Sequence, residues 1–353
     1  MDFENINLDD LYSEDNKLRQ AKNVFSTVGL AIAILAIVRL VTQIFMARVI
    51  YLFFPAIADL WWADWLLSVV PLYVFALPVF LLVLNRIPTA GHNGTYLVKS
   101  ADGEPVATDK PKFGIKQWIL FAVASVGVMY IGSYIGQAVM NYLSYLMNYD
   151  YSSALGDMVD STPILGTVIM TCIIAPIGEE LLFRKLIIDK TRAYGDVPSI
   201  LLSASAFALF HMNYYQFFYA LFVGMIIGYV YTLTGKLRWC IAMHAFVNFI
   251  GAVLIPKATS FADLDALAEG NTEVILQNPL PYVLYMLASL IITLIVITSI
   301  VIIVFYARKP ALSKGGEPLP KGKAMGVVLR NGGIIFAALV LGALFSMNLL
   351  PMA

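Results

Sequence analysis

Long apolar runs are the feature that most restricts what this chain can fold into. They occupy residues 24–46, 64–84, 117–143, 163–187, 198–212, 216–234, 238–256, 281–307 and 331–350. A helix needs about 20 apolar residues to cross the hydrocarbon core of a bilayer, and only 198–212 is clearly short. With 60% apolar and 13% charged residues, against about 25% charged in soluble domains, the chain is predicted to be all-α: a polytopic transmembrane helix bundle of about 8–9 spans.

The loops between these runs predict the orientation of the bundle. Lys and Arg gather before the first run and in loops 85–116, 185–197 and 308–330, whereas loops 148–162 and 257–280 are mainly acidic. Because cytoplasmic loops carry the excess of Lys and Arg, the N-terminus is predicted to be cytoplasmic. The protein is expected in the cell membrane of a bacterium or in the endoplasmic reticulum membrane of a eukaryote.

The chain divides into four predicted sections. They are a cytoplasmic N-terminal tail (1–22), N-terminal transmembrane helices with a cytoplasmic loop at 85–116 (23–160), a central section (161–256) and C-terminal transmembrane helices (257–353). Gly and Pro make the loop a predicted connector, and His92 within it is expected to have no metal or catalytic role. The pairs Gly132/Gly136 and Gly224/Gly228 have the small-xxx-small spacing that lets helices pack closely.

The central section carries ionisable and amide groups inside apolar runs, in three motifs. These are Glu179-Glu180-x-x-x-Arg184, Phe207-x-x-x-His211 and His244-x-x-x-Asn248. A charged side chain at the centre of a membrane helix costs about 2.5–3.5 kcal/mol or more, so such groups usually mark function. Cys172 and Cys240 lie in the same section without metal-binding spacing and are predicted to be small packing residues.

Residues four apart share a helix face, whereas neighbours point about 100° apart. Glu180 is therefore predicted to pair with Arg184, which leaves Glu179 as the reactive carboxylate. His244 and Asn248 reach one site together, and the ring of Phe207 lies beside His211. Simple topology places His211 near the outer end of the short fifth span and His244 near the inner end of the seventh. A fifth helix that starts deep, or one that is tilted and broken near Pro198, is expected to bring them to one depth.

One carboxylate and two imidazoles support two hydrolytic mechanisms. In one, Glu179, His211 and His244 bind a metal, with Zn²⁺ the expected ion, and leave a position for water. In the other, Glu179 deprotonates water directly, His211 orients that water, and His244 with Asn248 donates hydrogen bonds to the oxyanion. Residue types alone leave both open.

In this order on successive helices, the three motifs resemble the CAAX protease and bacteriocin-processing family (CPBP) of intramembrane proteases. That family includes type II CAAX prenyl endopeptidases and bacterial Abi or bacteriocin-immunity proteins. The resemblance covers about residues 160–255 and implies that Glu179 and His211 activate water while His244 and Asn248 stabilise the oxyanion, with Glu180, Arg184 and Phe207 in support. The family is often described as metalloproteases, but a metal-free glutamate mechanism, which we favour, is also argued for its prenyl-endopeptidase branch.

The predicted function is an intramembrane endopeptidase that cuts a peptide or a membrane-tethered, lipidated protein of prenylated CAAX type near the cytoplasmic face. The chain has neither the His-Glu-x-x-His of site-2-type zinc proteases nor the Gly-x-Ser-Gly of rhomboid type. The alternative is a non-enzymatic bacteriocin-immunity or receptor-binding membrane protein; a transporter is disfavoured, because no inverted repeat of broken helices is found. Membrane lipid is an expected partner and nucleic acid is not, while the oligomeric state, the substrate and the role of Arg39 stay open.

Overall fold

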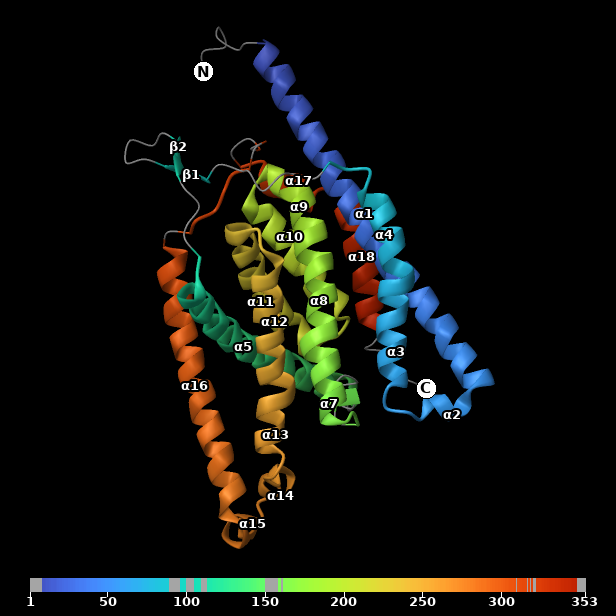
Figure 1. Cartoon of the computed structure of the whole chain (residues 1–353), viewed down its shortest axis with the longest axis vertical. Coiled ribbons are helices and arrows are strands. Elements are labelled where there is room, and N and C mark those ends of the chain that lie inside the picture. The colour runs from blue at the N-terminus through green and yellow to red at the C-terminus, as the bar shows by residue number, and fades with distance from the viewer. Residues whose placement is uncertain are drawn as a thin grey trace.

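The computed structural model describes residues 8–88, 96–99, 105–108, 113–149, 158–159, 161–308, 310–315, 317, 319 and 322–347. Within them, seven helical segments are long and apolar enough to cross a membrane: Glu14–Phe53, Ala63–Leu84, Ile115–Met147, Ile164–Tyr194, Tyr214–Thr234, Leu237–Thr259 and Pro279–Ala307. Two shorter apolar helices are α10 (Asp196–Phe210) and α18 (Gly332–Met347). These nine segments coincide with the nine predicted runs, so the predicted helical membrane bundle is confirmed (Figure 1).

Three of the segments are built from consecutive stretches of α- and π-helix. The first joins α3 (Ala63–Val70), η2 (Pro71–Ala76) and α4 (Leu77–Leu84). The second joins α7 (Ile164–Thr167), η3 (Val168–Ile174), α8 (Ala175–Glu180), η4 (Leu181–Ile188), α9 (Asp189–Thr191) and the 3₁₀ turn η5 (Arg192–Tyr194). The third joins α12 (Leu237–Asn248), η6 (Phe249–Leu254) and α13 (Ile255–Thr259).

The remaining helices are α1 (Leu8–Phe53), α2 (Pro55–Ala58), α5 (Ile115–Met147), α11 (Tyr214–Thr234), α14 (Leu264–Ala268), α15 (Glu273–Gln277), α16 (Pro279–Ala307) and α17 (Ala324–Leu329). One departure from the all-α class lies in the loop predicted as a connector. There, β1 (Tyr96–Lys99) pairs antiparallel with β2 (Pro105–Thr108), with Tyr96 opposite Thr108. His92 lies outside the described residues.

Small residues hold α11 between α5 and α10, as the two glycine pairs predict. A Cβ on Gly132 or on Gly136 would collide with the backbone of α11, at Tyr219 and at Tyr214 respectively. On the other side of α11, a Cβ on Gly224 would lie 3.3 Å from Ala204 of α10. Glycine at these positions therefore brings α10 and α5 close to α11, and α10 carries part of the site described below.

Helix α10 is continuous through Pro198, and the expected break near this residue does not occur. Pro198 is the third residue of the helix, and proline is tolerated in the first turn because the N–H groups there have no partner within the helix. Of the two expected forms of the fifth helix, the one broken near Pro198 is wrong; α10 is short and ends at Phe210, inside the bundle.

Alternation of the nine apolar segments defines two ends of the bundle. The basic end lies next to the Lys- and Arg-rich loops, and the helix ends found there are Leu84, Ile115, Tyr194 and Ala307. The opposite end is called the acidic end, and the helix ends found there are Phe53, Ala63, Met147, Ile164 and Thr259. In Figure 1 the basic end is at the top, with the start of α1, and the acidic end is at the bottom.

Candidate active site

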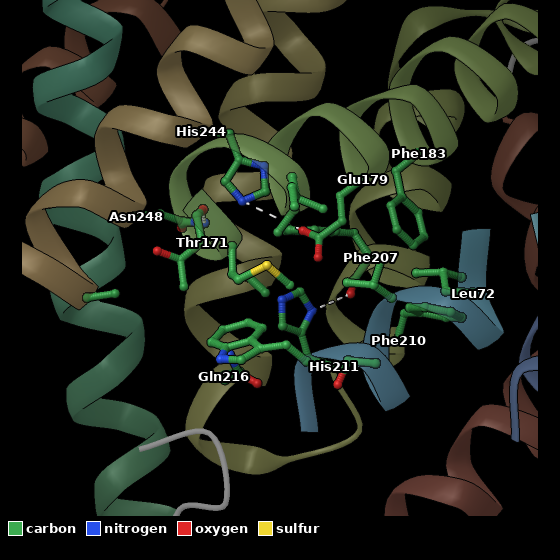
Figure 2. A pocket seen from close by; sticks show the side chains of 18 of the residues that line it. Leu72, Thr171, Glu179, Phe183, Phe207, Phe210, His211, Gln216, His244 and Asn248 are labelled. Carbon is green, nitrogen blue, oxygen red and sulfur yellow. Dashed lines mark hydrogen bonds and ion pairs between the residues drawn. The ribbon is translucent and has the colours of Figure 1, made fainter. Parts of the chain in front are cut away.

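The three predicted motifs meet at one pocket of about 230 Å³ in the helical bundle. Glu179, His211, His244 and Asn248 all line it, and Figure 2 shows them converging from α8, the end of α10, and α12. The sequence-predicted site residues are therefore brought together, with Phe207 between the two histidines. The Phe207 ring centroid lies 4.7 Å from that of His211 and 5.6 Å from that of His244.

Glu180 forms the predicted pair with Arg184 and also contacts His244. Its Oε2 lies 3.0 Å from Nε of Arg184, and both side chains are fully buried. Its Oε1 accepts a hydrogen bond from Nδ1 of His244 at 2.8 Å. The guanidinium of Arg184 also lies over the Phe207 ring, at 4.7 Å. Because a buried carboxylate is stable only with such partners, Glu180 is a positioning group that fixes the His244 ring.

Glu179 points into the pocket, away from the Glu180–Arg184 pair. Its side chain is 22% exposed, whereas that of Glu180 is 0% exposed. Its Oε2 lies 3.7 Å from Nε2 of His244, which is longer than a direct hydrogen bond. Glu179 is thus the carboxylate that a bound molecule can reach.

His211 is held at the end of α10 by a backbone carbonyl that the helix leaves free. The last four carbonyls of an α-helix have no partner within it; the backbone N–H of His211 donates to Ala208, and Nδ1 of His211 lies 2.8 Å from the Phe207 carbonyl oxygen. A carbonyl only accepts, so Nδ1 carries the proton. In the neutral ring, Nε2 is then an acceptor. Met212, in a left-handed conformation (φ 57°), ends the helix at this point.

Asn248 is anchored through a break in the hydrogen bonding of the facing helix. In η3 the N–H of Ala175 donates to the carbonyl of Met170, five residues back. In the same i,i+5 register the carbonyl of Thr171 would accept a hydrogen bond from residue 176. That residue is Pro176, which has no N–H. The carbonyl accepts instead from Nδ2 of Asn248, at 2.8 Å. The second N–H of the amide is left for another acceptor.

The possible zinc ligands Glu179, His211 and His244 all line the pocket. Among the residues that the structure describes, no three His, Cys, Asp or Glu side chains are arranged to hold a metal ion. Zinc binding by these three residues stays a prediction, and we derive no step through a metal. Cys172 and Cys240 are free thiols, and Cys240 is fully buried, consistent with packing.

The pocket also uses residues from α1 and from the α3–η2 segment, which the motifs did not indicate. Nη1 of Arg39 donates to the carbonyl of Phe210 at 3.3 Å, and its guanidinium lies 4.7 Å from the Phe210 ring. Tyr73 packs against Gly178, where a Cβ would collide with its ring. The charge of Arg39 within an apolar run was the one sequence signal for this wall; Tyr73 gave none.

The pocket extends toward the acidic end, which the loop charges predict to be non-cytoplasmic. The predicted orientation and the predicted site near the cytoplasmic face therefore disagree with each other. Its lining includes Trp65 and Ser68 near the start of α3, Met158 in the loop between α5 and α7, and Gln216 near the start of α11. All of these belong to the acidic end of the bundle. The pocket does not extend toward the basic end, because buried side chains of η4 and α10 fill the space there.

Fold and site together define a polytopic helical membrane protein with a carboxylate and two imidazoles gathered in its interior. Residues 161–250 match the family model described as type II CAAX prenyl endopeptidase Rce1-like. This match confirms the resemblance over the segment that carries all three motifs, and it supports intramembrane endopeptidase activity in general terms. No match is found among curated proteins or among solved structures.

Proposed function

We propose that the chain is an intramembrane endopeptidase in which Glu179 activates water for attack on a peptide bond. The single observation that supports this proposal is that two adjacent carboxylates, Glu179 and Glu180, have different surroundings. Glu180 is buried and engaged with Arg184 and His244, whereas Glu179 is partly exposed and faces the pocket. A general base must reach its proton, and of the two carboxylates Glu179 is the one placed to do so.

In the proposed reaction, Glu179 takes a proton from water while the water oxygen bonds to the substrate carbonyl carbon. Nε2 of His211, an acceptor in the neutral ring, orients that water. The carbonyl oxygen becomes an oxyanion, and the intermediate collapses as the C–N bond breaks. The leaving nitrogen receives the proton from Glu179. The products are a carboxylic acid and an amine, so atoms and protons balance.

The oxyanion would accept hydrogen bonds from Nε2 of His244 and Nδ2 of Asn248. Because Nδ1 of His244 already donates to Glu180, donation from Nε2 as well requires a ring that carries both protons. The two carboxylates Glu179 and Glu180 then balance the charges of Arg184 and His244. Such donors, fixed before the reaction, are worth about 10²–10³-fold in kcat each.

The test is Glu179→Gln in the purified protein, assayed with quenched fluorescent peptides and with membrane-tethered peptides. We expect kcat/KM to fall about 10²–10⁴-fold, the usual contribution of a general base. Glu273→Gln changes an exposed glutamate in α15 and is the matched control. Full cleavage by Glu179→Gln would contradict the proposal, and toxin protection that survives this change would favour the non-enzymatic alternative.

Zinc-assisted hydrolysis is the second form of this proposal, and elemental analysis of the active protein separates the two. The metal-free mechanism predicts activity without stoichiometric metal and unchanged rates after chelation. Loss of cleavage with chelator, restored by Zn²⁺, would assign the activation of water to the metal. The substrate class, a peptide or a prenylated protein, is also part of the proposal.

A further inference from the structure

The position of the pocket within the bundle bears on the side from which a substrate arrives. Glu179 lies near the middle of the segment Ile164–Tyr194, about 15 residues or roughly 22 Å from either end at 1.5 Å per residue. The depth of Glu179 therefore does not favour either side of the membrane. The direction of access is decided by what fills the space on each side of it.

Toward the basic end the pocket is closed by fully packed side chains. Phe183 and Phe207, which line its floor, are 1% and 2% exposed. Beyond them Arg184, Ile187 and Ile188 are at most 1% exposed. Ser203 of α10 donates to the carbonyl of Phe183 at 2.7 Å, which joins η4 to α10. No route from the basic loops to Glu179 remains among these described residues.

Toward the acidic end the lining residues are partly exposed and lie close to helix termini. Gln216 is two residues from the start of α11 and Ser68 is five residues from the start of α3, roughly 3 Å and 8 Å along their helices. Both are partly exposed pocket residues, as is Met158. The pocket therefore continues to partly exposed side chains at this end, and we take this as the end from which a molecule reaches Glu179, which is 22% exposed.

Charge identifies which side of the membrane this end faces. Loops at the basic end contain Arg86, Lys190, Lys314 and Lys323 among many other basic residues, whereas the acidic-end loop 257–280 contains Lys257 as its single basic residue and several carboxylates. Lys and Arg in short loops stay in the cytoplasm. The acidic end is thus the non-cytoplasmic end.

We propose that Glu179 is reached from the non-cytoplasmic side of the membrane, so that the substrate is a polypeptide segment exposed at that face. The substrate class rests on the proposed function, whereas the direction of access does not. A chain delivered to this site has been exported or inserted beforehand. Of the two substrate classes proposed above, this direction of access favours an exported or inserted peptide over a prenylated protein that stays in the cytosol.

The direction of access is tested with single cysteines and a small, charged, membrane-impermeant methanethiosulfonate. The background is Cys172→Ala in the full chain, since Cys240 is 0% exposed and serves as its own unlabelled control. Ser68→Cys is nearly isosteric and reports the pocket. Asp59→Cys and Lys314→Cys, both exposed, report the acidic and the basic end. Right-side-out and inside-out vesicles are labelled in parallel.

We expect Ser68→Cys to react in right-side-out vesicles together with Asp59→Cys, and Lys314→Cys to react only in inside-out vesicles. Reaction of Ser68→Cys only together with Lys314→Cys, or from neither side while Asp59→Cys reacts, would overturn the proposal. Reaction of Asp59→Cys from the cytoplasmic side would overturn the orientation and the substrate class with it.

A second measurement separates this proposal from the proposed function. Quenched fluorescent peptides are added outside vesicles of each orientation that contain the wild-type chain or Glu179→Gln. Cleavage by the wild type in right-side-out vesicles only is the expected result. Cleavage only in inside-out vesicles overturns the direction of access. Correct cysteine labelling without Glu179-dependent cleavage in either orientation refutes the peptidase while the direction of access stands.

Discussion

At the scale of single residues, the two neighbouring glutamates have opposite surroundings although the sequence places them side by side. Because neighbouring residues on a helix point about 100° apart, Glu180 is fully buried in contact with Arg184 and His244, whereas Glu179 points into the pocket. Spacing alone predicted this division, because the i,i+4 relation selects Glu180 as the partner of Arg184. The contact between Glu180 and His244 was not predictable, since 64 residues separate them.

Glu180→Gln is expected to lower stability more than Glu179→Gln. Removing one partner of a buried ion pair leaves an uncompensated charge, here on Arg184, and costs about 3–5 kcal/mol. Glu179 makes no comparably short contact, so its replacement should leave the unfolding temperature nearly unchanged. Thermal unfolding of both variants in the same detergent is the measurement. Equal melting temperatures for the two would show that Glu180 is not the structural member of the pair.

Arg39→Met is expected to lower activity through His211. Arg39 binds the carbonyl of Phe210, the residue before His211, at a helix end where the carbonyls lack partners. A hydrogen bond from a charged group is worth about 1.5–3 kcal/mol, so kcat/KM should fall about 10- to 100-fold. Arg39→Lys should recover part of the rate, and Arg19→Met, exposed in the same helix, is the control. Unchanged kinetics for Arg39→Met would remove it from the site.

At the scale of helices, one helix end and one irregular turn supply polar groups to the site. The end of α10 presents His211, and the π-helical register of η3 followed by Pro176 frees the Thr171 carbonyl for Asn248. π-Helical stretches are frequent at functional sites because they release backbone groups and redirect side chains. The apolar runs predicted the helices, but not their local changes of register.

Gly132→Ala is expected to separate α5 from α11. The added methyl group would collide with the backbone of Tyr219, and backbone cannot move aside as a flexible side chain does. Overpacking of this kind costs about 1–3 kcal/mol, which thermal unfolding measures. Gly326→Ala in α17, where a Cβ meets nothing within 4 Å, should be neutral. A stable Gly132→Ala protein would show that this helix pair has more room than the structure gives it.

At the scale of the whole molecule, the site is assembled from more of the chain than the matched segment. Residues 161–250 supply the motifs, but Arg39 of α1 and Tyr73 of η2 form another wall of the pocket. The family model therefore covers the proposed reacting groups and leaves the part of the pocket wall formed by Arg39 and Tyr73 to the flanking helices. Differences in substrate between proteins with the same motifs are expected to originate there.

Splitting the chain within loop 148–162 tests this assembly. Residues from 163 onward, expressed alone, should insert into the membrane but lack cleavage activity, because the wall from α1 and η2 is missing. Co-expression with the N-terminal part should restore Glu179-dependent cleavage, since inserted helices associate through packing in the membrane. Full activity of the C-terminal part alone would show that Arg39 and Tyr73 are dispensable.

The sequence by itself determined the nine apolar segments, the Glu180–Arg184 pair and the convergence of Glu179, His211, His244 and Asn248. The segments and the pair follow from hydrophobic length and helical spacing. The convergence was predicted because charge in hydrocarbon usually marks function and because the three motifs resemble those of one family. Only the tertiary structure decided that Glu180 also contacts His244, that Arg39 binds the Phe210 carbonyl at the end of α10, and that the pocket lining extends toward the acidic end. Each of these features depends on which helices pack together and on where their buried side chains fill the space. The sequence does not show this, because contacts between distant parts of the chain leave no periodic pattern in it.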